Sequence, residues 1–300
     1  MTYLQYIYKK IQHKMPLKAL SELEQKQIDS LRKEIKTLET DQNDAITSEH
    51  TEDAWLKNIR QLREKIINQD PRNFLNWDVI QHTMFHQCKK VELDYLKKMK
   101  RWDKFNEALT ESRIGNPLPY KHLPTSSGNL IHQAYNFAQI LNEFDFQIND
   151  IKTIFEFGGG YGAMSYFLFN YGFSGKYIIF DLPEFAALQK YYLNASGIDE
   201  NKNLSTVSSI QELSQILDEN NVDIFIANWS LSEVPINTRQ KIINTIPNCK
   251  YYLIAYQENF KSINNIEYFK KFINERNNYQ WINKEISHLP GNFYLLGKKH

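Results

Sequence analysis

The first 68 residues follow the spacing of amphipathic helices. Apolar side chains recur at intervals of three and four residues, at Ile28, Leu31, Ile35 and Leu38. This spacing places them on one face of a helix that runs from about Leu17 to Leu38. After a polar stretch at 40–50, helical spacing resumes at Trp55, Ile59, Leu62 and Ile66. The pattern predicts two helices joined as a hairpin.

The next 80 residues also favour helices. From Asp70 to Lys100 the pattern stays helical, and Pro71 is well placed at a helix start because its ring suits the first helical position. The segment 115–129 is rich in proline and glycine and is expected to be a loop. A further helix is expected from about Leu130 to Phe144.

Beyond about Asp150, short apolar runs alternate with helical patterns. Runs of strand length lie at 152–157, 176–181, 204–208, 222–228 and 251–256. Strands that alternate with helices predict βαβ units and a mostly parallel sheet, because parallel neighbours need a crossover connection. In the last 20 residues, two strand-like runs joined by a short loop with Pro290 and Gly291 predict an antiparallel hairpin that closes the sheet.

Three parts follow from these patterns. Residues 1–68 are expected to form a helical hairpin for oligomerisation or capping, 69–150 a helical cap or lid, and 151–300 a nucleotide-binding domain. The expected fold class is α/β, with a seven-stranded Rossmann-like sheet after an α-helical N-terminal region. The apolar stripe of the hairpin also allows a homodimer through the N-terminal helices.

A glycine-rich turn carries the most specific signal. The run Glu156-Phe157-Gly158-Gly159-Gly160-Tyr161-Gly162 follows the first predicted strand and opens a helix. Glycines there allow a tight turn and a close approach of the backbone to a ligand. Asp181 ends the second strand, where a carboxylate can accept hydrogen bonds from both ribose hydroxyls. Together these elements predict an adenosine-type ligand, and the structural alternative is a turn that merely joins strand to helix.

The glycines alone do not decide which nucleotide binds. Gly158, Gly160 and Ala163 also satisfy the fingerprint of NAD enzymes. Three features favour S-adenosylmethionine: Glu156 completes the pattern ExGxGxG, the nucleotide unit begins in mid-chain, and the chain ends in a strand hairpin.

The runs EFGGGYG and YIIFDLPE resemble class I S-adenosylmethionine-dependent methyltransferases, and more narrowly the bacterial sugar O-methyltransferases. SLSEVP at 230–235 is a further match, although Val234 stands where that group has methionine. The resemblance implies a methyltransferase-type sheet and a sugar hydroxyl as acceptor. It also implies that Glu156, Gly158, Gly160 and Gly162 surround the methionine part of the cofactor. Asp181 would hold the ribose, and Leu182 would cover the adenine.

Chemistry is expected beyond the carboxyl ends of the strands, where open α/β sheets bind their ligands. Asn228, at the end of the fourth strand, is expected to contact the cofactor, and the loop after it supplies Glu233. Glu233 is the first candidate for the base that removes the acceptor proton. It can instead be a carboxylate that interacts with the dipole of the next helix. His132 and His288 are rival bases, and each has a structural alternative.

The composition indicates which kinds of partner and which cellular compartment suit the protein. With 36 basic and 35 acidic residues, the chain has no global field for nucleic acid. Two cysteines, Cys88 and Cys249, fit a reducing cytoplasm. Apolar runs are too short to span a bilayer, so any membrane contact is expected to be peripheral. His82 and His86 share a helical spacing and Cys88 is nearby, but there is no HExxH signature and no second ligand cluster, so they are expected to be packing or surface histidines rather than a metal site.

The leading hypothesis is therefore an S-adenosylmethionine-dependent O-methyltransferase with a small-molecule or glycan acceptor. The competing hypotheses are an NAD-dependent oxidoreductase and a non-catalytic scaffold with a degenerate methyltransferase domain.

Overall fold

The computed structural model describes residues 3–40, 53–84, 88–198, 203–218, 221–246 and 248–300. Contacts divide the chain into two compact units. The helical unit comprises Met1–Tyr135, Gly160–Gly172 and Leu182–Asn201, and the sheet unit comprises Asn136–Gly159, Phe173–Asp181 and Lys202–His300.

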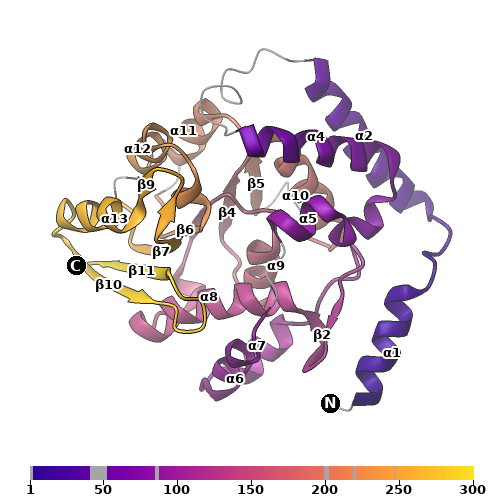
Figure 1. Cartoon of the computed structure of the whole chain (residues 1–300), viewed down its shortest axis with the longest axis horizontal. Helices are drawn as coiled ribbons and strands as arrows, with labels where there is room; N and C mark the ends of the chain where they lie inside the picture. Colours follow the sequence, from indigo (N-terminus) through magenta and orange to yellow (C-terminus); the bar gives the residue numbers. More distant parts are fainter. Residues whose placement is uncertain (1–2, 41–52, 85–87, 199–202, 219–220, 247) are drawn as a thin grey trace. The chain divides into compact units, whose positions relative to one another are not determined.

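The sheet unit is built on a seven-stranded sheet (Figure 1). Its strands are β3 (Thr153–Phe157), β4 (Lys176–Phe180), β5 (Leu204–Val207), β6 (Ile224–Asn228), β7 (Tyr251–Gln257), β10 (Tyr279–Glu285) and β11 (Asn292–Lys299). The order is β10-β11-β7-β6-β3-β4-β5. The first five strands in sequence are parallel, and β11 runs antiparallel to both β7 and β10. The expected mostly parallel sheet with a C-terminal antiparallel hairpin is confirmed.

The order of the strands defines the fold. From β3 the chain moves outward to β4 and β5 and then returns to the other side of β3 with β6 and β7, which makes a topological switch point between β3 and β6. The last strand is inserted between β7 and β10, unlike the sixth parallel strand of the dinucleotide-binding Rossmann fold. The protein therefore has a methyltransferase-like α/β fold.

Three helices cover one face of this sheet: α11 (Ile210–Asp218), α12 (Ile236–Asn244) and α13 (Asn265–Asn274). Their apolar side chains share one buried cluster with Phe155, Phe225 and Tyr252 of the strands. Successive residues of a strand point to opposite faces of the sheet, so Tyr251 lies on the face opposite to Tyr252. The centroid of its ring lies 4.7 Å from that of Phe146.

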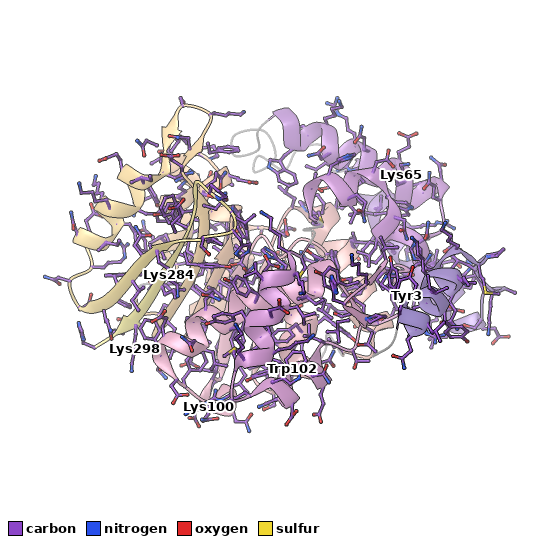
Figure 2. All side chains as sticks on the ribbon, turned by 60° about the horizontal axis from the view of Figure 1, so that its bottom comes forward. Tyr3, Lys65, Lys100, Trp102, Lys284 and Lys298 are labelled. Carbon is purple, nitrogen blue, oxygen red and sulfur yellow. The ribbon has the colours of Figure 1, made fainter. Side chains whose placement is uncertain are left out.

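The second half of α8 (Gly128–Phe144) belongs to the sheet unit. On it, Glu143 accepts a hydrogen bond from Lys284 of β10 at 2.6 Å (Lys284 is labelled in Figure 2). Nearby, the Tyr294 hydroxyl of β11 donates to Asn136. α8 confirms the helix expected around Leu130 to Phe144.

The helical unit contains most of the remaining helices. They are α1 (Tyr3–Lys14), α2 (Glu22–Thr40), α4 (Asp53–Asn68), α5 (Asp78–Thr83), α6 (Lys90–Lys98), α7 (Trp102–Ala108), α9 (Ala163–Asn170) and α10 (Pro183–Ala195). α2 and α4 confirm the two predicted helices, and the polar residues 41–50 between them lie outside the described residues.

The helix expected from Leu17 begins instead at Glu22, because Ser21 caps it. The Ser21 hydroxyl accepts from the backbone N–H of Glu24 at 3.3 Å, and the Glu24 carboxylate accepts from the backbone N–H of Ser21 at 2.8 Å. This reciprocal pair is a capping box, which satisfies two backbone donors at the helix start.

The helical pattern from Asp70 to Lys100 is divided into three pieces in the described residues: a 3-10 turn (Pro71–Asn76), α5 and α6. Pro71 does open the first of them, and the Asp70 carboxylate caps it by accepting from the N–H of Arg72 at 3.0 Å.

The expectation of a loop at 115–129 is wrong in part. The segment contains β1 (Pro119–Tyr120) and β2 (Leu123–Ser127), which pair antiparallel. Proline is tolerated there because both strands of a two-stranded ribbon are edges, where a missing N–H costs little.

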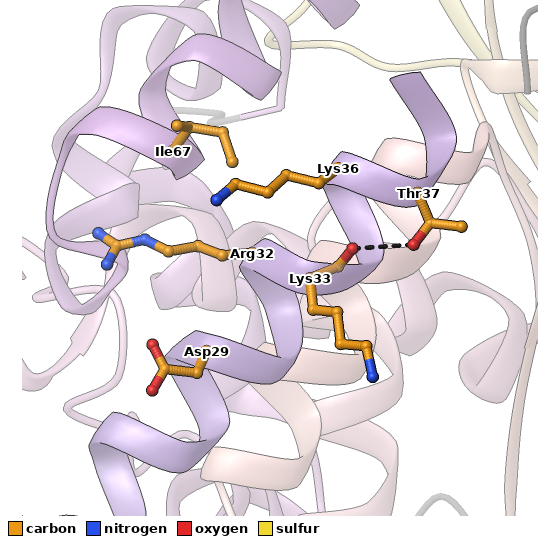
Figure 3. A pocket seen from close by; sticks show the side chains of 6 residues that line it. All are labelled: Asp29, Arg32, Lys33, Lys36, Thr37 and Ile67. Atoms are coloured by element: carbon orange, nitrogen blue, oxygen red, sulfur yellow. Dashed lines mark hydrogen bonds between the residues drawn. The ribbon is translucent and has the colours of Figure 1, made fainter. Parts of the chain in front are cut away.

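The apolar stripe of α2 is covered inside the helical unit. Ile28, Leu31 and Ile35 are at most 3% exposed, and α2 packs against α4 and α10. At the open side of this packing, α2 and α4 border the shallow pocket in Figure 3. Arg32 lies in it and donates from Nε to the carbonyl of Ile66 at 3.1 Å, which satisfies an acceptor at the end of α4.

Ile35→Ala is expected to lower the free energy of unfolding by roughly 2–5 kcal/mol, because a fully buried side chain would leave a cavity. Leu23→Ala, at a position 66% exposed on the same helix, is the matched control and should change it by less than about 0.5 kcal/mol. Urea unfolding measures both, and equal values for the two variants would contradict this packing.

Candidate active site

The candidate site lies along the carboxyl edge of the parallel strands. Gly158, Asp181 and Trp229 follow β3, β4 and β6, and Glu258 follows β7. The register of β11 pairs Asn292 with Gln257, so the turn between β10 and β11 comes to the same edge. Hydrogen bonds confirm this arrangement, since the Trp229 indole N–H donates to Asn292 at 2.7 Å and the Glu258 N–H donates to Gly291 at 2.8 Å.

The turn after β3 requires glycine at its first position. Gly158 has a φ of +72°, and a Cβ built there would lie 2.3 Å from the Cβ of Ser230. The Ser230 hydroxyl donates to the carbonyl of Phe157, which fastens the loop after β6 to the end of β3. The close approach of these two loops therefore excludes any side chain at Gly158.

The same turn continues into the helical unit at Gly160 and Gly162, which have φ values of +59° and +96°. Gly162 is the N-cap of α9, so the turn opens a helix as the sequence predicted. A Cβ at Gly160 would meet no described atom nearer than Met84, at 3.6 Å.

Glu156 lies buried in β3, just before the glycine turn. It is 4% exposed, and its carboxylate accepts a hydrogen bond from the Tyr177 hydroxyl at 2.8 Å. Burial, together with the charge of Asp181, raises the pKa of Glu156 to about 8 despite that hydrogen bond. Glu156 is therefore a buried acid in the strand that leads into the glycine turn, with Tyr177 as its hydrogen-bond donor.

Asp181 directly follows β4 and is half-buried. Its backbone N–H donates to the carbonyl of Val207 at 3.1 Å, which fixes the start of the turn against β5. Leu182, the next residue, is the N-cap of α10, and Pro183 occupies the first position of that helix. Leu182 belongs to the helical unit, whereas Asp181 belongs to the sheet unit.

The loop after β6 has a strained backbone. Asn228 is the half-buried last residue of β6, and Trp229 has a φ of +63°, a conformation that costs free energy for any residue except glycine. The Trp229 N–H donates to the carbonyl of Ala255 at 2.7 Å, and its indole is held by Asn292. These bonds fix an aromatic plane at the carboxyl edge of the sheet.

Glu233 ends a 3-10 turn (Ser230–Glu233) in that loop and is half-buried. It precedes α12, which begins at Ile236. Burial raises the pKa of the Glu233 carboxyl above its ordinary value. A raised pKa brings a carboxylate closer to the range in which it accepts protons efficiently at neutral pH.

Sequence reasoning missed Arg239, which holds the backbone on both sides of Glu233. Its guanidinium is fully buried and donates to the carbonyls of Ser232 at 2.7 Å and Val234 at 2.9 Å. A third bond runs to the Asn265 side chain at 2.8 Å. Nothing in the run INTRQK distinguishes Arg239 from a surface arginine, because its role depends on carbonyls that turn back towards α12.

The two histidines nominated as bases lie in different units. His288 is in the turn between β10 and β11, at the carboxyl edge of the sheet. His132 is on α8 in the helical unit, where it is 1% exposed and its Nδ1 lies 3.1 Å from the buried carboxylate of Glu92. The sheet unit thus brings together Glu156, Gly158, Asp181, Asn228, Glu233 and His288.

Within the described ranges, no cluster of three or more histidine, cysteine, aspartate or glutamate side chains is arranged to hold a metal ion. His82 lies in the last turn of α5, and His86 lies outside the described residues.

No protein-family model and no curated protein sequence matches this chain. Solved structures do resemble it. One is an O-methyltransferase family protein from Burkholderia thailandensis, with a TM-score of 0.40, 11% identity, and coverage of 56% of this chain and 59% of that one. Another is the SAH-bound methyltransferase of Podospora anserina, with a TM-score of 0.41, 9% identity, and coverage of 74% and 92%. An rRNA methylase from Streptococcus thermophilus has a TM-score of 0.41, 15% identity, and coverage of 50% and 88%.

Proposed function

We propose that this chain is an S-adenosylmethionine-dependent O-methyltransferase that acts on a sugar hydroxyl. One observation carries the proposal: the glycine turn with buried Glu156, the ribose-type acid Asp181 and the Glu233 loop share the carboxyl edge of a methyltransferase-like sheet. The acceptor would be a nucleotide-linked sugar or a glycan in the course of synthesis.

The residues at this edge suit the cofactor. Gly158 lets the loop after β6 approach the turn, and a Cβ at Gly160 would reach only ordinary van der Waals contact with Met84, at 3.6 Å. Under the proposal, Glu156, Gly158, Gly160 and Gly162 hold the methionine part, Asp181 accepts hydrogen bonds from the ribose, and Leu182 covers the adenine. Asn228 contacts the cofactor from the end of β6. When bound, S-adenosylmethionine supplies an electrophilic methyl group.

The residues after β6 would prepare the acceptor. Methyl transfer to a hydroxyl needs alignment and removal of a proton. Trp229, fixed by Asn292, offers a rigid aromatic face of the kind that suits a sugar ring. Glu233, with its raised pKa, would take the hydroxyl proton, and Arg239 would keep its backbone in place. A sugar acceptor is also what the resemblance of SLSEVP implies.

Mass spectrometry of the cell's surface glycans, with and without the gene, tests the acceptor class. Loss of a methyl group from one sugar is the expected result. An unchanged glycan profile, with methylation lost from a different class of molecule, would overturn the sugar assignment but not the methyl transfer.

Asp181→Ala is expected to weaken S-adenosylhomocysteine binding at least tenfold. Hydrogen bonds to a charged group contribute roughly 1.5–3 kcal/mol each, and the variant would lose two of them. Calorimetry measures the effect, with Asp223→Ala as a control, because Asp223 binds Lys250 and the start of β3 instead of lying at the carboxyl edge. Unchanged affinity in folded Asp181→Ala would remove the ribose assignment.

The pKa of Glu156 predicts two effects of pH with opposite signs. In the free protein the group stays protonated up to about 8, whereas its ordinary pKa is 4.5, so its contribution to stability is complete below 4.5 and is lost progressively as the pH rises to about 8. A positively charged cofactor instead favours the ionised carboxylate. Binding should therefore tighten as the pH rises from 6 to 8 and then level off.

Urea unfolding and calorimetry across this range measure both effects, and Glu156→Gln should remove both. The affinity for S-adenosylmethionine, which carries a positively charged sulfonium, should depend more steeply on pH than the affinity for S-adenosylhomocysteine. Equal slopes for Glu156→Gln and the natural chain would show that another group titrates.

A further inference from the structure

The N-terminal segment from Tyr3 to Leu23 carries most of the large apolar side chains that are exposed in the described residues. Eleven large apolar side chains are exposed in these ranges, and eight of them lie in this segment. They are Tyr3, Leu4, Tyr8, Ile11, Met15, Leu17, Leu20 and Leu23. Tyr3 is labelled in Figure 2. Single exposed apolar residues are ordinary, but a concentration of this kind marks an interaction surface.

Three of these side chains form one stripe along α1, and Met15 continues the same spacing directly after its end. Leu4, Tyr8, Ile11 and Met15 are spaced by four, three and four residues, and they are 57–76% exposed. The other side of α1 packs beside β1 and β2, and the Asn116 side chain donates to the carbonyl of His13 at 3.1 Å. This packing fixes the helix with its apolar stripe turned outward.

The charge of the same segment identifies what would cover the stripe. Residues 3–23 contain Lys9, Lys10, Lys14 and Lys18 and a single acidic residue, Glu22, although the whole chain has a net charge of only +1. Lys14 and Lys18 are exposed. A second copy of this chain, docked by two-fold symmetry, would bring the same lysines together, because such an interface is self-complementary. An anionic partner fits better.

We propose that residues 3–23 dock on the surface of an anionic lipid bilayer. An amphipathic helix with apolar and aromatic side chains on one face and nearby lysines lies in the plane of the membrane interface. Tyrosine favours that interface, and lysine stems can lie along it while their charges reach the headgroups. Among the described helices, none is long and apolar enough to cross a membrane. The segment would thus hold the protein at the surface.

Co-sedimentation of the full chain with vesicles tests this proposal. Phosphatidylcholine vesicles that contain about one third phosphatidylglycerol should bind the protein. Pure phosphatidylcholine vesicles should bind it at least tenfold more weakly, because each lysine near an anionic surface raises the partition coefficient about fivefold. Ile11→Glu should lose at least tenfold in partition, and Lys14→Gln about fivefold. Val91→Glu is the control, because Val91 is an exposed apolar residue on a different helix, α6, and this variant should bind vesicles like the natural chain.

Circular dichroism checks that each variant keeps its helices, because all three positions are exposed and tolerate a polar side chain. Equal partition of Ile11→Glu and the natural chain would overturn the proposal, as would failure to bind anionic vesicles. Light scattering gives a further outcome against it: a dimer that Ile11→Glu dissociates, without vesicle binding, would mean that a second copy covers the stripe.

Discussion

Glu233→Gln is expected to lower kcat by 10²–10⁴-fold, roughly 3–5 kcal/mol of activation free energy, with cofactor affinity nearly unchanged. A sugar hydroxyl is a poor nucleophile until its proton is being removed. Glutamine keeps the shape and the hydrogen-bonding reach of glutamate but cannot take the proton. Because the natural Glu233 must be ionised to act, kcat/KM should also fall as the pH drops through its raised pKa, and the variant should lack that fall.

Steady-state kinetics with the acceptor, or a close analogue, measures this effect. Glu258→Gln is the matched control, because Glu258 is an exposed acid at the same edge of the sheet. Natural turnover in Glu233→Gln, with turnover lost in a His288 or His132 variant, would assign the base to a histidine. Glu233 would then serve the helix that follows it.

Gly160→Ala is expected to weaken cofactor binding by at least about a hundredfold, roughly 3 kcal/mol. A Cβ there would make ordinary van der Waals contact with Met84, at 3.6 Å, so the free protein can hold it, and the loss of affinity is expected because the proposal places the cofactor against this turn. Bulkier Gly160→Val should abolish binding. The positive φ of Gly160 adds a backbone strain of roughly 1–2 kcal/mol, which must be separated from the effect on the ligand.

Gly197→Ala provides that separation. Gly197 has a φ of +86° and nothing within 4 Å of a built Cβ, so alanine there suffers the same kind of strain far from the glycine turn in sequence. Both variants should lose similar stability in urea, and only Gly160→Ala should lose affinity in calorimetry. Natural affinity in Gly160→Ala would mean that the glycine run is only a structural turn.

The sheet could be predicted from the sequence because each parallel strand is a short, buried apolar run between helical patterns. The runs around Ile154, Ile178 and Phe225 are continuously apolar, because their side chains are buried on both faces of the sheet. The hairpin at the end was also predicted. The insertion of β11 between β7 and β10 was not, because the pairing of Asn292 with Gln257 is a long-range choice that local pattern does not encode.

The helical half was predicted less well at its boundaries. The start of α2 depends on a short-range signal, the Ser21 and Glu24 capping box, which outweighs the apolar spacing that extends back to Leu17. The short strands that begin at Pro119 and Leu123 were not predicted, because proline is normally unfavourable in a strand. In the candidate site, the turn and the acids were visible as a motif, whereas Arg239 and the place of His288 depend on tertiary contacts.

Calorimetry of the natural chain with S-adenosylhomocysteine and with NAD tests the central claim most directly. We expect one molecule of S-adenosylhomocysteine to bind per chain, with binding weakened in Asp181→Ala, and no saturable heat with NAD. Saturable binding of NAD without binding of S-adenosylhomocysteine would contradict methyl transfer and support an oxidoreductase. Binding of neither would contradict the cofactor site itself.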